Sequence, residues 1–512
     1  MYDVLIAGYG PTGMLAALLL GRAGQKVCVL ERYTTLYNLP RVGIVHDDVQ
    51  RMFQEVGILD RVQPSMTFLP VYELANEGRV LLSSKVAPLA THGWPEFISV
   101  YQPAFEAELD RMVRAEPNIE LHQGETVVGV DQTPDSVTVT TNGASGESRF
   151  EARYAIGADG GNSFVRNAIG VEYEDLGFDQ AWLVIDAKSK REQRADLPYM
   201  RQFCEPAQPG MTMRMGPDHR RWSFMLFDGE DPNEATRPEN VWHRLDRREG
   251  GTPDEFELVR VVNYQFRSLL ASSWRRRRVF LAGDACHQMP PFLAQGLCSG
   301  FRDAHNLAWK LDLVLKGKAS DALLDAYEQE RLPNARATII ESAAVGQNVI
   351  ERNPERARER DERLIAMQAA NDSVQDLRLI AFRVPGFEDG VIAKGAPAAG
   401  DAFGQARVRY NGVEGQFDDV AGRGWLILAR NGDPEGTLSP EDAAFWRSLD
   451  GKTLLLGEGP GDVQDLDGYY TSLFDAYGCD VLLKRPDYYI YGGARTVGEL
   501  PALLHSLRLR LA

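Results

Sequence analysis

The sequence has few cysteines, and none of them is spaced for redox or metal chemistry. Its 512 residues include five, with no CxxC or CxxxxC pair among them: Cys28, Cys204, Cys286, Cys298 and Cys479. An odd, scattered set of this kind is typical of reduced thiols in a cytosolic protein. We therefore expect a cytoplasmic protein with no bound metal and without the thiol chemistry of a disulfide reductase.

Long apolar runs and an excess of positive charge are missing as well. The longest unbroken apolar run near the N-terminus covers residues 14–20, far fewer than the roughly 20 residues that span a bilayer. Lys and Arg number 56 against 73 Asp and Glu, which gives a net charge of −17. Because such a charge repels phosphate backbones and anionic lipid headgroups, we expect neither nucleic acid nor a membrane as a partner.

The first 31 residues have the pattern of a dinucleotide-binding unit. A continuous apolar run, DVLIAG, is typical of a buried parallel strand, and it leads into Gly8-Tyr-Gly-Pro-Thr-Gly13. Apolar residues at helical spacing follow, and a second apolar strand ends in Glu31. In such a unit Gly8 permits a tight turn, Gly10 lets the backbone approach a pyrophosphate, and Gly13 allows close helix–strand packing. Glu31 is placed for ribose hydroxyls, but the pattern alone leaves both NAD and FAD open.

Two polar residues and an Asp-Gly turn come next along the chain. Arg41 precedes a short extended stretch, a helix begins near Asp47, and Gln102 stands at the start of another helix. Alternating strands joined by a Pro-Asp turn then predict antiparallel hairpins before Asp159. An Asp at the end of an apolar strand suits a contact with ribose or ribityl hydroxyls, although strand-Asp-Gly also describes an ordinary turn.

Residues 277–319 carry the most specific pattern in the chain. A buried strand ends in Gly283-Asp284, a loop with two adjacent prolines follows, and we expect a helix from about Ser299. Such a loop and helix N-terminus offer free backbone N–H groups that can hold negative charge beside a ring system. His287, close to the Gly-Asp turn, is interpreted as a support for this loop.

These three patterns, in this order, resemble the flavoprotein aromatic hydroxylases, the single-component group related to p-hydroxybenzoate hydroxylase. The resemblance covers residues 1 to about 345, and its most specific part is GDACHQMPP followed by SGFRDAHNLAWKL. Within the group, four stretches look closest to the 3-(3-hydroxyphenyl)propionate hydroxylases: NLPRVGIVHDDVQRMFQ, WLVIDAK, RRWSFMLFDGEDP and DALLDAYEQERLPNA. The resemblance implies FAD as the bound cofactor, NADH or NADPH as a transiently bound co-substrate, and O2 as the oxidant.

The resemblance also implies which residues hold FAD, from the glycine loop at the pyrophosphate to Asp284 at the ribityl chain. The expected cofactor-binding residues are Gly8, Gly10, Pro11, Thr12, Gly13, Glu31, Arg32, Arg41, Gln102, Asp159, Asp284, Pro291, Gly296, Leu297 and Cys298. Relatives often have Asn where this chain has Cys298. A backbone contact at this position would tolerate the thiol, whereas a side-chain contact would not, and an inert buried thiol is the alternative.

The implied chemistry calls for a base or relay at the substrate hydroxyl, because a phenolate is a better nucleophile than a phenol. His46 and Tyr264 are the candidate catalytic residues. The alternatives are a satisfied or surface histidine and a core-facing strand aromatic. Arg214 and Arg221 are the candidate substrate-binding residues, since an arginine can bind a carboxylate through two parallel hydrogen bonds, although strand arginines more often point to water.

The expected fold is α/β, with a Rossmann-like FAD-binding domain, an α+β substrate domain built on a β-sheet, and a C-terminal thioredoxin-like domain. The expected FAD-binding domain is discontinuous and comprises residues 1–175 and 265–345. The substrate sheet occupies 176–264, a helical connector 346–395 and the C-terminal domain 396–512. Without a CxxC pair, the last domain has no thioredoxin chemistry, and a role in packing or oligomer contact is expected.

The predicted function is hydroxylation of a phenolic compound in aromatic catabolism, through a flavin C4a-hydroperoxide. By resemblance the substrate is a phenolic acid, with polyketide phenols and hydroxypyridines as the alternatives. The predicted partners are this small aromatic substrate and a second copy of the chain in a homodimer. The alternatives are another flavoprotein of the same fold, namely an oxidase, epoxidase or halogenase-like enzyme, and a non-catalytic flavin-binding regulator. None of the eight tryptophans lies in the WxWxIP stretch that a halogenase would show.

Overall fold

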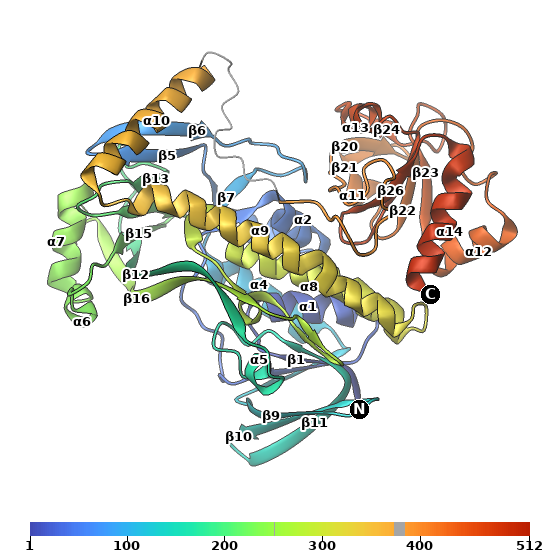
Figure 1. Ribbon diagram of the computed structural model, residues 1–512, viewed down its shortest axis with the longest axis horizontal. Helices are drawn as coiled ribbons and strands as arrows, with labels where there is room; N and C mark the ends of the chain where they lie inside the picture. Colours follow the sequence, from blue (N-terminus) through green and yellow to red (C-terminus); the bar gives the residue numbers. More distant parts are fainter. Residues whose placement is uncertain (250, 373–383) are drawn as a thin grey trace.

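The computed structural model describes residues 1–249, 251–372 and 384–512. Two large sheets are formed within the first 300 residues, and a separate unit is formed by the residues after 400 (Figure 1). Helices α8 (Gln295–Leu315) and α9 (Asp325–Ile350) cross the centre of the molecule between these parts (Figure 1). No helix in the described ranges is both long and apolar enough to cross a membrane.

The first sheet is the predicted dinucleotide-binding sheet. Its strand order is β17-β18-β11-β1-β2-β8, with β10 and β9 attached to β11 as antiparallel hairpins. Strand β1 pairs in parallel with both β2 and β11, as continuous apolar strands require. The strands are β1 (Tyr2–Ala7), β2 (Val27–Glu31), β8 (Ile119–Gln123), β9 (Thr126–Gln132), β10 (Val137–Gly143), β11 (Gly146–Gly157), β17 (Arg275–Arg276) and β18 (Val279–Leu281).

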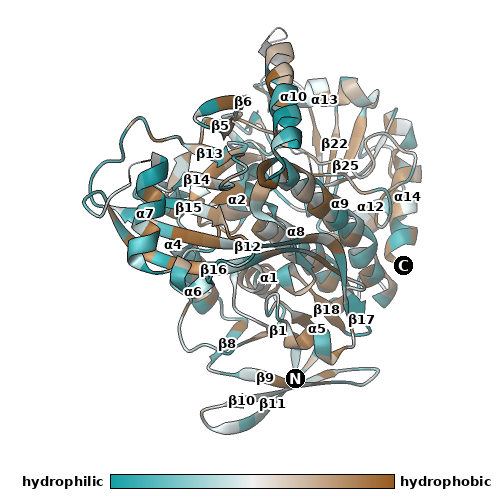
Figure 2. Cartoon of the chain, turned by 60° about the vertical axis from the view of Figure 1, so that its left-hand side comes forward, coloured by the Kyte–Doolittle hydropathy of each residue, from teal (hydrophilic) through white to brown (hydrophobic). Residues whose placement is uncertain are grey.

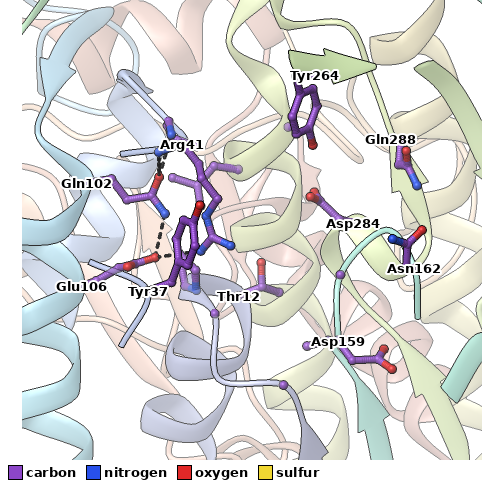
Figure 3. A pocket seen from close by; sticks show the side chains of 18 of the residues that line it. Thr12, Tyr37, Arg41, Gln102, Glu106, Asp159, Asn162, Tyr264, Asp284 and Gln288 are labelled. Atoms are coloured by element: carbon purple, nitrogen blue, oxygen red, sulfur yellow. Dashed lines mark hydrogen bonds and ion pairs between the residues drawn. The ribbon is translucent and has the colours of Figure 1, made fainter. Parts of the chain in front are cut away.

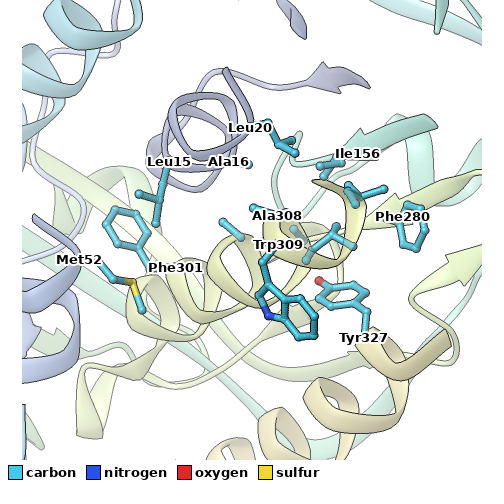
Figure 4. Close-up of a cluster of buried hydrophobic side chains, with 14 of the residues drawn as sticks. Leu15, Ala16, Leu20, Met52, Ile156, Phe280, Phe301, Ala308, Trp309 and Tyr327 are labelled. Atoms are coloured by element: carbon cyan, nitrogen blue, oxygen red, sulfur yellow. The ribbon is translucent and has the colours of Figure 1, made fainter. Parts of the chain in front are cut away.

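Helices α1 and α8 pack together against this sheet and form the main core. Leu15 and Ala16 of α1 lie near Phe301 of α8, with Ile156 and Phe280 of the sheet on the other side (Figure 4). The helices of this part are α1 (Pro11–Arg22), α2 (Asp47–Glu55), α3 (Leu59–Val62), α4 (Gln102–Ala115), α5 (Phe164–Ala168), α8 and α9. Helix α2 begins at Asp47 and α4 at Gln102, as the sequence predicts.

The second sheet is larger than the predicted substrate segment. Its order is β19-β16-β12-β15-β14-β13-β5-β6, so two strands come from residues before 86. Strand β13 pairs in parallel with β5, which extends the sheet by an edge hairpin that local patterns cannot reveal. The strands are β5 (Val71–Asn76), β6 (Arg79–Lys85), β12 (Tyr173–Ser189), β13 (Met200–Phe203), β14 (Gly210–Met215), β15 (His219–Met225), β16 (Phe256–Ala271) and β19 (His287–Gln288).

Short elements surround the second sheet. A small sheet of order β3-β7-β4 is formed by strands that flank β5 and β6 in the sequence, and α10 packs on β6. Helix α7 is largely hydrophilic along its length (Figure 2). These elements are β3 (Ile44–His46), β4 (Met66–Phe68), β7 (Phe97–Val100), α6 (Pro232–Ala235), α7 (Pro238–Glu249) and α10 (Pro354–Asp372). Part of the predicted connector, residues 373–383, lies outside the described residues.

The C-terminal unit has the expected thioredoxin-like arrangement. Its central sheet has the order β23-β22-β25-β26, with β22 and β23 parallel and the other pairs antiparallel. Apolar residues fill β22 and β25 inside the unit (Figure 2). A second sheet has the order β21-β20-β24. The elements are β20 (Arg407–Tyr410), β21 (Val413–Gln416), α11 (Phe417–Val420), β22 (Leu426–Ala429), α12 (Pro440–Ser448), β23 (Lys452–Leu455), β24 (Gln464–Asp465), α13 (Tyr469–Tyr477), β25 (Val481–Lys484), β26 (Ile490–Ala494) and α14 (Leu500–Leu511).

Buried ion pairs attach the C-terminal unit to the central helices. Glu330 of α9 accepts hydrogen bonds from Arg485 at 2.7 and 2.8 Å and from Lys310 of α8 at 2.8 Å. Asp487 pairs with Arg485 and accepts from Asn306 of α8 at 2.9 Å. All five side chains are buried. Because buried charges are stable only when they are fully paired, this contact fixes the unit against α8 and α9.

Candidate active site

One continuous cavity of about 500 Å³ joins the dinucleotide-binding turn to the second sheet. Its walls come from the β1–α1 turn, the loop before β3, the Asp159 and Asp284 turns, the first turn of α8 and the face of the second sheet. Side chains from several of these elements, among them Thr12, Arg41 and Tyr264, surround the same space (Figure 3). A cavity of this size is in the range of small-molecule sites.

The glycines of the β1–α1 turn serve two different purposes. A Cβ atom on Gly13 would lie 2.2 Å from the carbonyl oxygen of Gly8, and one on Gly8 would lie 2.3 Å from that of Ala158. These two positions therefore need glycine so that the backbone segments can pack. A Cβ on Gly10 meets no protein atom within 4 Å, and Gly10 lines the cavity. A side chain there would fill the space that a pyrophosphate needs.

Helix α1 begins against this space without a capping side chain. Its N-cap residue is Gly10, no side chain in the described part of the chain accepts from its first N–H groups, and Pro11 occupies the first turn. Uncapped N–H groups at a helix N-terminus, together with the helix dipole, are a binding site for an anion. Pro11 and Thr12 line the cavity with the glycines, so the turn has the features of a phosphate cradle.

Glu31 is held in place at the end of β2. Its Oε2 accepts from the backbone N–H of Tyr9 at 2.8 Å, and its Oε1 accepts from that of Tyr33 at 2.9 Å. Each carboxylate oxygen retains acceptor capacity, and the residue lines the cavity beside Arg32. This geometry suits the two ribose hydroxyls of an adenosine.

Gln102 lines the cavity, but its amide group binds protein. Its Oε1 accepts from the backbone N–H groups of Arg41 and Val42 at 2.8 and 2.6 Å, and its Nε2 donates to Glu106 at 2.6 Å (Figure 3). Arg41 pairs with the same Glu106 oxygen at 3.3 Å and lies over the ring of Tyr37. Gln102 therefore positions the Arg41 loop, and Arg41, whose side chain is half exposed, lines the cavity beside it.

The two aspartates predicted for the cofactor have different surroundings. Asp159 accepts from the hydroxyl of Ser163, the N-cap residue of α5, and from the backbone N–H of Val165 at 3.1 Å, so it supports the first turn of this short helix. Asp284 has no hydrogen-bond partner for its carboxylate among the described residues, and it points into the cavity (Figure 3). Because the protein surrounds this cavity, burial raises the pKa of Asp284. A carboxylate that points into the cavity without a protein partner is suited to accept hydrogen bonds from ribityl hydroxyls.

Asp303 of α8 supports the turn at Asp284 through hydrogen bonds. The carboxylate of Asp303 accepts from the backbone N–H of Gly283 at 3.0 Å, from His287 at 2.7 Å and from Arg331 at 2.9 Å. His287 is fully buried, which agrees with the predicted role as a support. Cys286 lies in the same cluster, where ligand atoms of Cys286, His287 and Asp303 are within 4.8 Å of one another. Both oxygens of the Asp303 carboxylate already accept hydrogen bonds, one from Arg331 and the other from the backbone N–H of Gly283.

Helix α8 begins four residues earlier than predicted. Ala294 is its N-cap residue in the left-handed conformation (φ 54°), and the helix starts at Gln295. Sequence reasoning placed the start at Ser299, a residue type common at N-caps, but Ser299 is buried inside the helix. The first turn has no capping side chain, and Gly296 and Leu297 line the cavity with Pro291. The free N–H groups expected beside a ring system are therefore present.

Cys298 does not reach the cavity. It is fully buried, its thiol donates to the carbonyl oxygen of Ala294 at 3.5 Å, and burial raises its pKa to about 12. Cys298 therefore fits the alternative interpretation, an inert buried thiol. The thiol that stands here in place of Asn therefore forms no part of the cavity surface.

The second sheet closes the cavity with two rows of side chains in cross-strand register. The first row runs across five strands and consists of Arg260, Asp186, Arg221, Met213 and Met200. The second row, one step along the strands, consists of Val262, Val184, Ser223 and Met211. Every member except Asp186 lines the cavity. Alternate residues of a strand share a face, so this wall is mainly apolar with cationic groups at one side.

The structure separates the two predicted catalytic residues. Tyr264 lines the cavity and is 47% exposed, and partial desolvation of its hydroxyl by the surrounding walls raises its pKa. His46 lies outside the cavity wall, 4% exposed, with Nε2 at 3.1 Å from the carbonyl oxygen of Leu293 and 2.9 Å from Nε2 of Gln295. Burial lowers the pKa of His46 to about 4. His46 therefore corresponds to the satisfied histidine considered as its alternative.

The two predicted substrate arginines are also placed differently. Arg214 is on the face of β14 away from the cavity, because Met213 takes the inward position and neighbours in a strand alternate. Arg221 lines the cavity, but its guanidinium binds Asp186 and backbone carbonyls. Sequence reasoning missed Arg260, which shares the inward face of β16 with Val262 and Tyr264. The alternation in RVVNY was the signal that could have identified it.

Comparison with known proteins identifies the family of this chain. The family described as "FAD binding domain" matches residues 1–342, and the "HcaD C-terminal domain" family matches residues 400–510. A probable NADH-specific resorcinol 4-hydroxylase of Rhodococcus jostii (strain RHA1) is 40% identical over 99% of this chain and 94% of the relative. A 3-(3-hydroxy-phenyl)propionate/3-hydroxycinnamic acid hydroxylase of Mycobacterium sp. (strain JLS) is 32% identical over 96% of this chain and 89% of its own length.

Solved structures have the same fold over the whole chain. The flavin-dependent monooxygenase PieE, in complex with FAD and substrate, superposes with a TM-score of 0.83 at 21% identity and covers 100% of this chain and 99% of its own. OxyS anhydrotetracycline hydroxylase from Streptomyces rimosus has a TM-score of 0.77 at 27% identity and covers 99% of this chain and 98% of its own. The chain belongs to the FAD binding domain family, among its flavin-dependent aromatic hydroxylases.

Proposed function

We propose that this FAD-dependent hydroxylase acts on a small phenol and takes its electrons from NADH. The observation that carries the proposal is the continuous cavity, which has a nucleotide cradle at one end and an apolar sheet wall at the other. The relative with 40% identity is named for resorcinol and for NADH, and the relatives near 32% identity are named for hydroxyphenylpropionate. Resorcinol and hydroxyphenylpropionate both contain a phenolic ring.

The residues of the cradle fit FAD. We assign the pyrophosphate to the N-terminus of α1 and Gly10, the adenosine ribose to Glu31, and the ribityl chain to Asp284. The first turn of α8, at Gly296 and Leu297, would face the isoalloxazine ring and stabilise negative charge on its carbonyl edge through free N–H groups. When bound, FAD supplies the oxidation chemistry, accepting a hydride from NADH and activating O2.

The sheet wall would hold the aromatic ring and exclude water from it. Val184, Val262 and Met213 provide apolar surface, and Met200 and Met211 add flexible thioethers that adapt to the ring. Exclusion of water matters for this chemistry because water promotes loss of the activated oxygen as peroxide.

Tyr264 is the residue that we propose for the substrate hydroxyl. It lies on the same inward face as Val262, and its hydroxyl points toward the interior of the cavity (Figure 3). Its raised pKa keeps the Tyr264 hydroxyl protonated at neutral pH, so it can donate a hydrogen bond to a phenolate oxygen and stabilise the ionised substrate.

The test is a substrate panel with the purified full-length protein. NADH oxidation and oxygen uptake are measured with resorcinol, with 3-(3-hydroxyphenyl)propionate and with benzoate, which has no phenolic hydroxyl. We expect a phenol, and not benzoate, to accelerate NADH oxidation, and the product to gain one oxygen atom from ¹⁸O2 by mass spectrometry. Stoichiometric peroxide with unmodified substrate for every phenol would contradict the proposal.

A further inference from the structure

Three arginines on the second sheet differ in what their guanidinium groups already bind. Arg221 is saturated: its Nε and Nη2 lie 2.6 and 3.0 Å from the two oxygens of Asp186, and its Nη1 donates to the carbonyl oxygen of Arg41 at 2.7 Å. Arg267 lines the rim of the cavity, half exposed, and approaches Asp179 at 3.6 Å. Arg260, in the wall itself, is the exception.

Arg260 has hydrogen-bonding capacity to spare. Its Nη1 donates to the carbonyl oxygen of Pro40 at 2.7 Å and lies 3.8 Å from an oxygen of Asp186, beyond hydrogen-bond distance. Its Nε and Nη2 have no hydrogen-bond partner among the described residues. The side chain is 11% exposed and lines the cavity. Since a guanidinium carries five N–H donors, most of those of Arg260 are available to a bound molecule.

The charges of the row leave Arg260 without a full counter-ion. Asp186 lies between Arg260 and Arg221 in register and forms both of its close hydrogen bonds with Arg221. One carboxylate against two guanidinium groups gives the row a net charge of +1. The Pro40 carbonyl fixes the direction of Arg260 without neutralising it. A positive group fixed in a mainly apolar wall favours an anionic oxygen in its vicinity.

We propose that Arg260 binds the anionic oxygen of the aromatic substrate and so determines which phenols the enzyme accepts. The inference rests on the proposed function. Arg260 would donate charge-assisted hydrogen bonds to the oxygen, while the ring lies on Val262 and Val184 of the adjacent row. Two oxygens have this chemistry: a phenolate, formed from the substrate hydroxyl, and a carboxylate on a substrate side chain.

The position of Arg260 separates its role from those of the other cations of the cavity. Arg32 and Arg41 belong to the nucleotide end, where Glu31 and the α1 turn lie. Arg260 touches the Arg41 loop only through the Pro40 carbonyl, and its side chain extends from the sheet wall, two residues from Val262 on the same face of β16. Its anion is therefore expected to come from the substrate and not from the phosphates of FAD.

The experiment compares Arg260→Gln and Arg260→Lys with Arg201→Gln in the FAD-loaded protein. Arg201 is a matched control, because it lies on β13 of the same sheet, pairs with Glu73 at 2.7 Å and does not line the cavity. Dissociation constants for resorcinol and for 3-(3-hydroxyphenyl)propionate are measured by calorimetry between pH 6.5 and 9. FAD content and the thermal unfolding midpoint are recorded for each variant.

A phenolate and a carboxylate give different results. For a phenolate, Arg260→Gln weakens binding of both ligands by about 10- to 100-fold, as for loss of a hydrogen bond to a charged group, and shifts the pH dependence of resorcinol binding to higher pH. For a carboxylate, only 3-(3-hydroxyphenyl)propionate loses affinity. Arg260→Lys should retain part of the affinity in either case, and Arg201→Gln all of it.

Three outcomes would overturn the assignment of Arg260. They are unchanged affinity for both ligands in Arg260→Gln, an equal loss in Arg201→Gln, and loss of FAD affinity with ligand affinity intact. If the wild-type protein hydroxylates a phenol and any of these is found, the inference fails and the proposed function stands. A wild-type protein that binds FAD but neither phenol contradicts both.

Discussion

Asp186 and Arg221 form a bidentate ion pair across β12 and β15 with N–O distances of 2.6 and 3.0 Å. Arg221 also donates to the carbonyl oxygen of Arg41 at 2.7 Å, in the loop that Gln102 holds from the other side. The pair therefore connects the sheet wall to the nucleotide end of the cavity. Because two parallel hydrogen bonds fix orientation as well as distance, the pair sets how the two ends of the site face each other.

Replacing Asp186 with Asn should destabilise the protein by about 3–5 kcal/mol, because Arg221 would then remain charged and uncompensated in the interior. The free energy of unfolding is measured by urea denaturation of the FAD-free protein. Asp179→Asn is the control: its partner Arg267 and Asp179 itself are half exposed, so the expected loss is about 0–1 kcal/mol. Equal losses in the two variants would show that the buried pair stabilises the protein no more than the exposed pair does.

Gly10 and Gly13 should respond differently to alanine. Gly10→Ala meets no protein atom, so the FAD-free protein should keep its unfolding midpoint, while FAD affinity falls at least about tenfold because the methyl group occupies the phosphate space. Gly13→Ala places a methyl group 2.2 Å from the carbonyl oxygen of Gly8 and should destabilise the FAD-free protein itself. Flavin fluorescence titration and thermal unfolding separate the two effects. If Gly10→Ala left FAD affinity unchanged, the assignment of the pyrophosphate to this turn would be wrong.

The nucleotide end of the molecule could be predicted because its information is local. The turn from Gly8 to Gly13, the strand ending in Glu31 and the Gly283-Asp284 turn each combine a strand, a turn and a helix within about 30 residues. The second sheet could be predicted only in part. Its pairing of β13 with β5 joins residues more than 120 positions apart, and no periodicity within either strand specifies a partner.

The substrate end was harder to predict for a related reason. The side-chain period of a strand shows that Arg214 and Met213 face opposite sides, but it does not show which side meets the cofactor. Likewise, a polar residue beside the site can bind protein and not ligand. Gln102 and His46 are both buried by hydrogen-bonded neighbours that lie about 60 and 250 positions away in the sequence.

Glu330 should be essential for docking of the C-terminal unit. Glu330→Gln leaves Lys310 and Arg485 without their shared buried anion, so we expect a loss of about 3–5 kcal/mol in the free energy of unfolding. Glu441→Gln is the matched control in the C-terminal unit, because Glu441 is exposed and pairs with Arg508 at the surface. Thermal unfolding measures both. A loss in Glu330→Gln no larger than in the control would mean that the ion pairs do not secure the unit.

His46 should make the stability of the FAD-free protein depend on pH. Burial lowers its pKa to about 4, below the value near 6.5 of an exposed histidine, so between these values the unfolded chain binds the proton more readily. The stabilising contribution is therefore complete above pH 6.5 and is lost as the pH falls toward 4, up to about 3 kcal/mol. Nearby Asp48 and Arg302 are retained in His46→Asn, so only the imidazole proton is removed.

The comparison of wild type with His46→Asn isolates this contribution. Urea denaturation at pH 7.5, 6.5, 5.5 and 4.5 gives the free energy of unfolding of each protein. The value for wild type minus the value for His46→Asn should fall steadily below pH 6.5. Asp47, whose pKa burial raises to about 7, titrates over an overlapping range but is present in both proteins and cancels in the difference. A difference that stays constant from pH 7.5 to 4.5 would mean that His46 has the same pKa in the folded protein as in the unfolded chain.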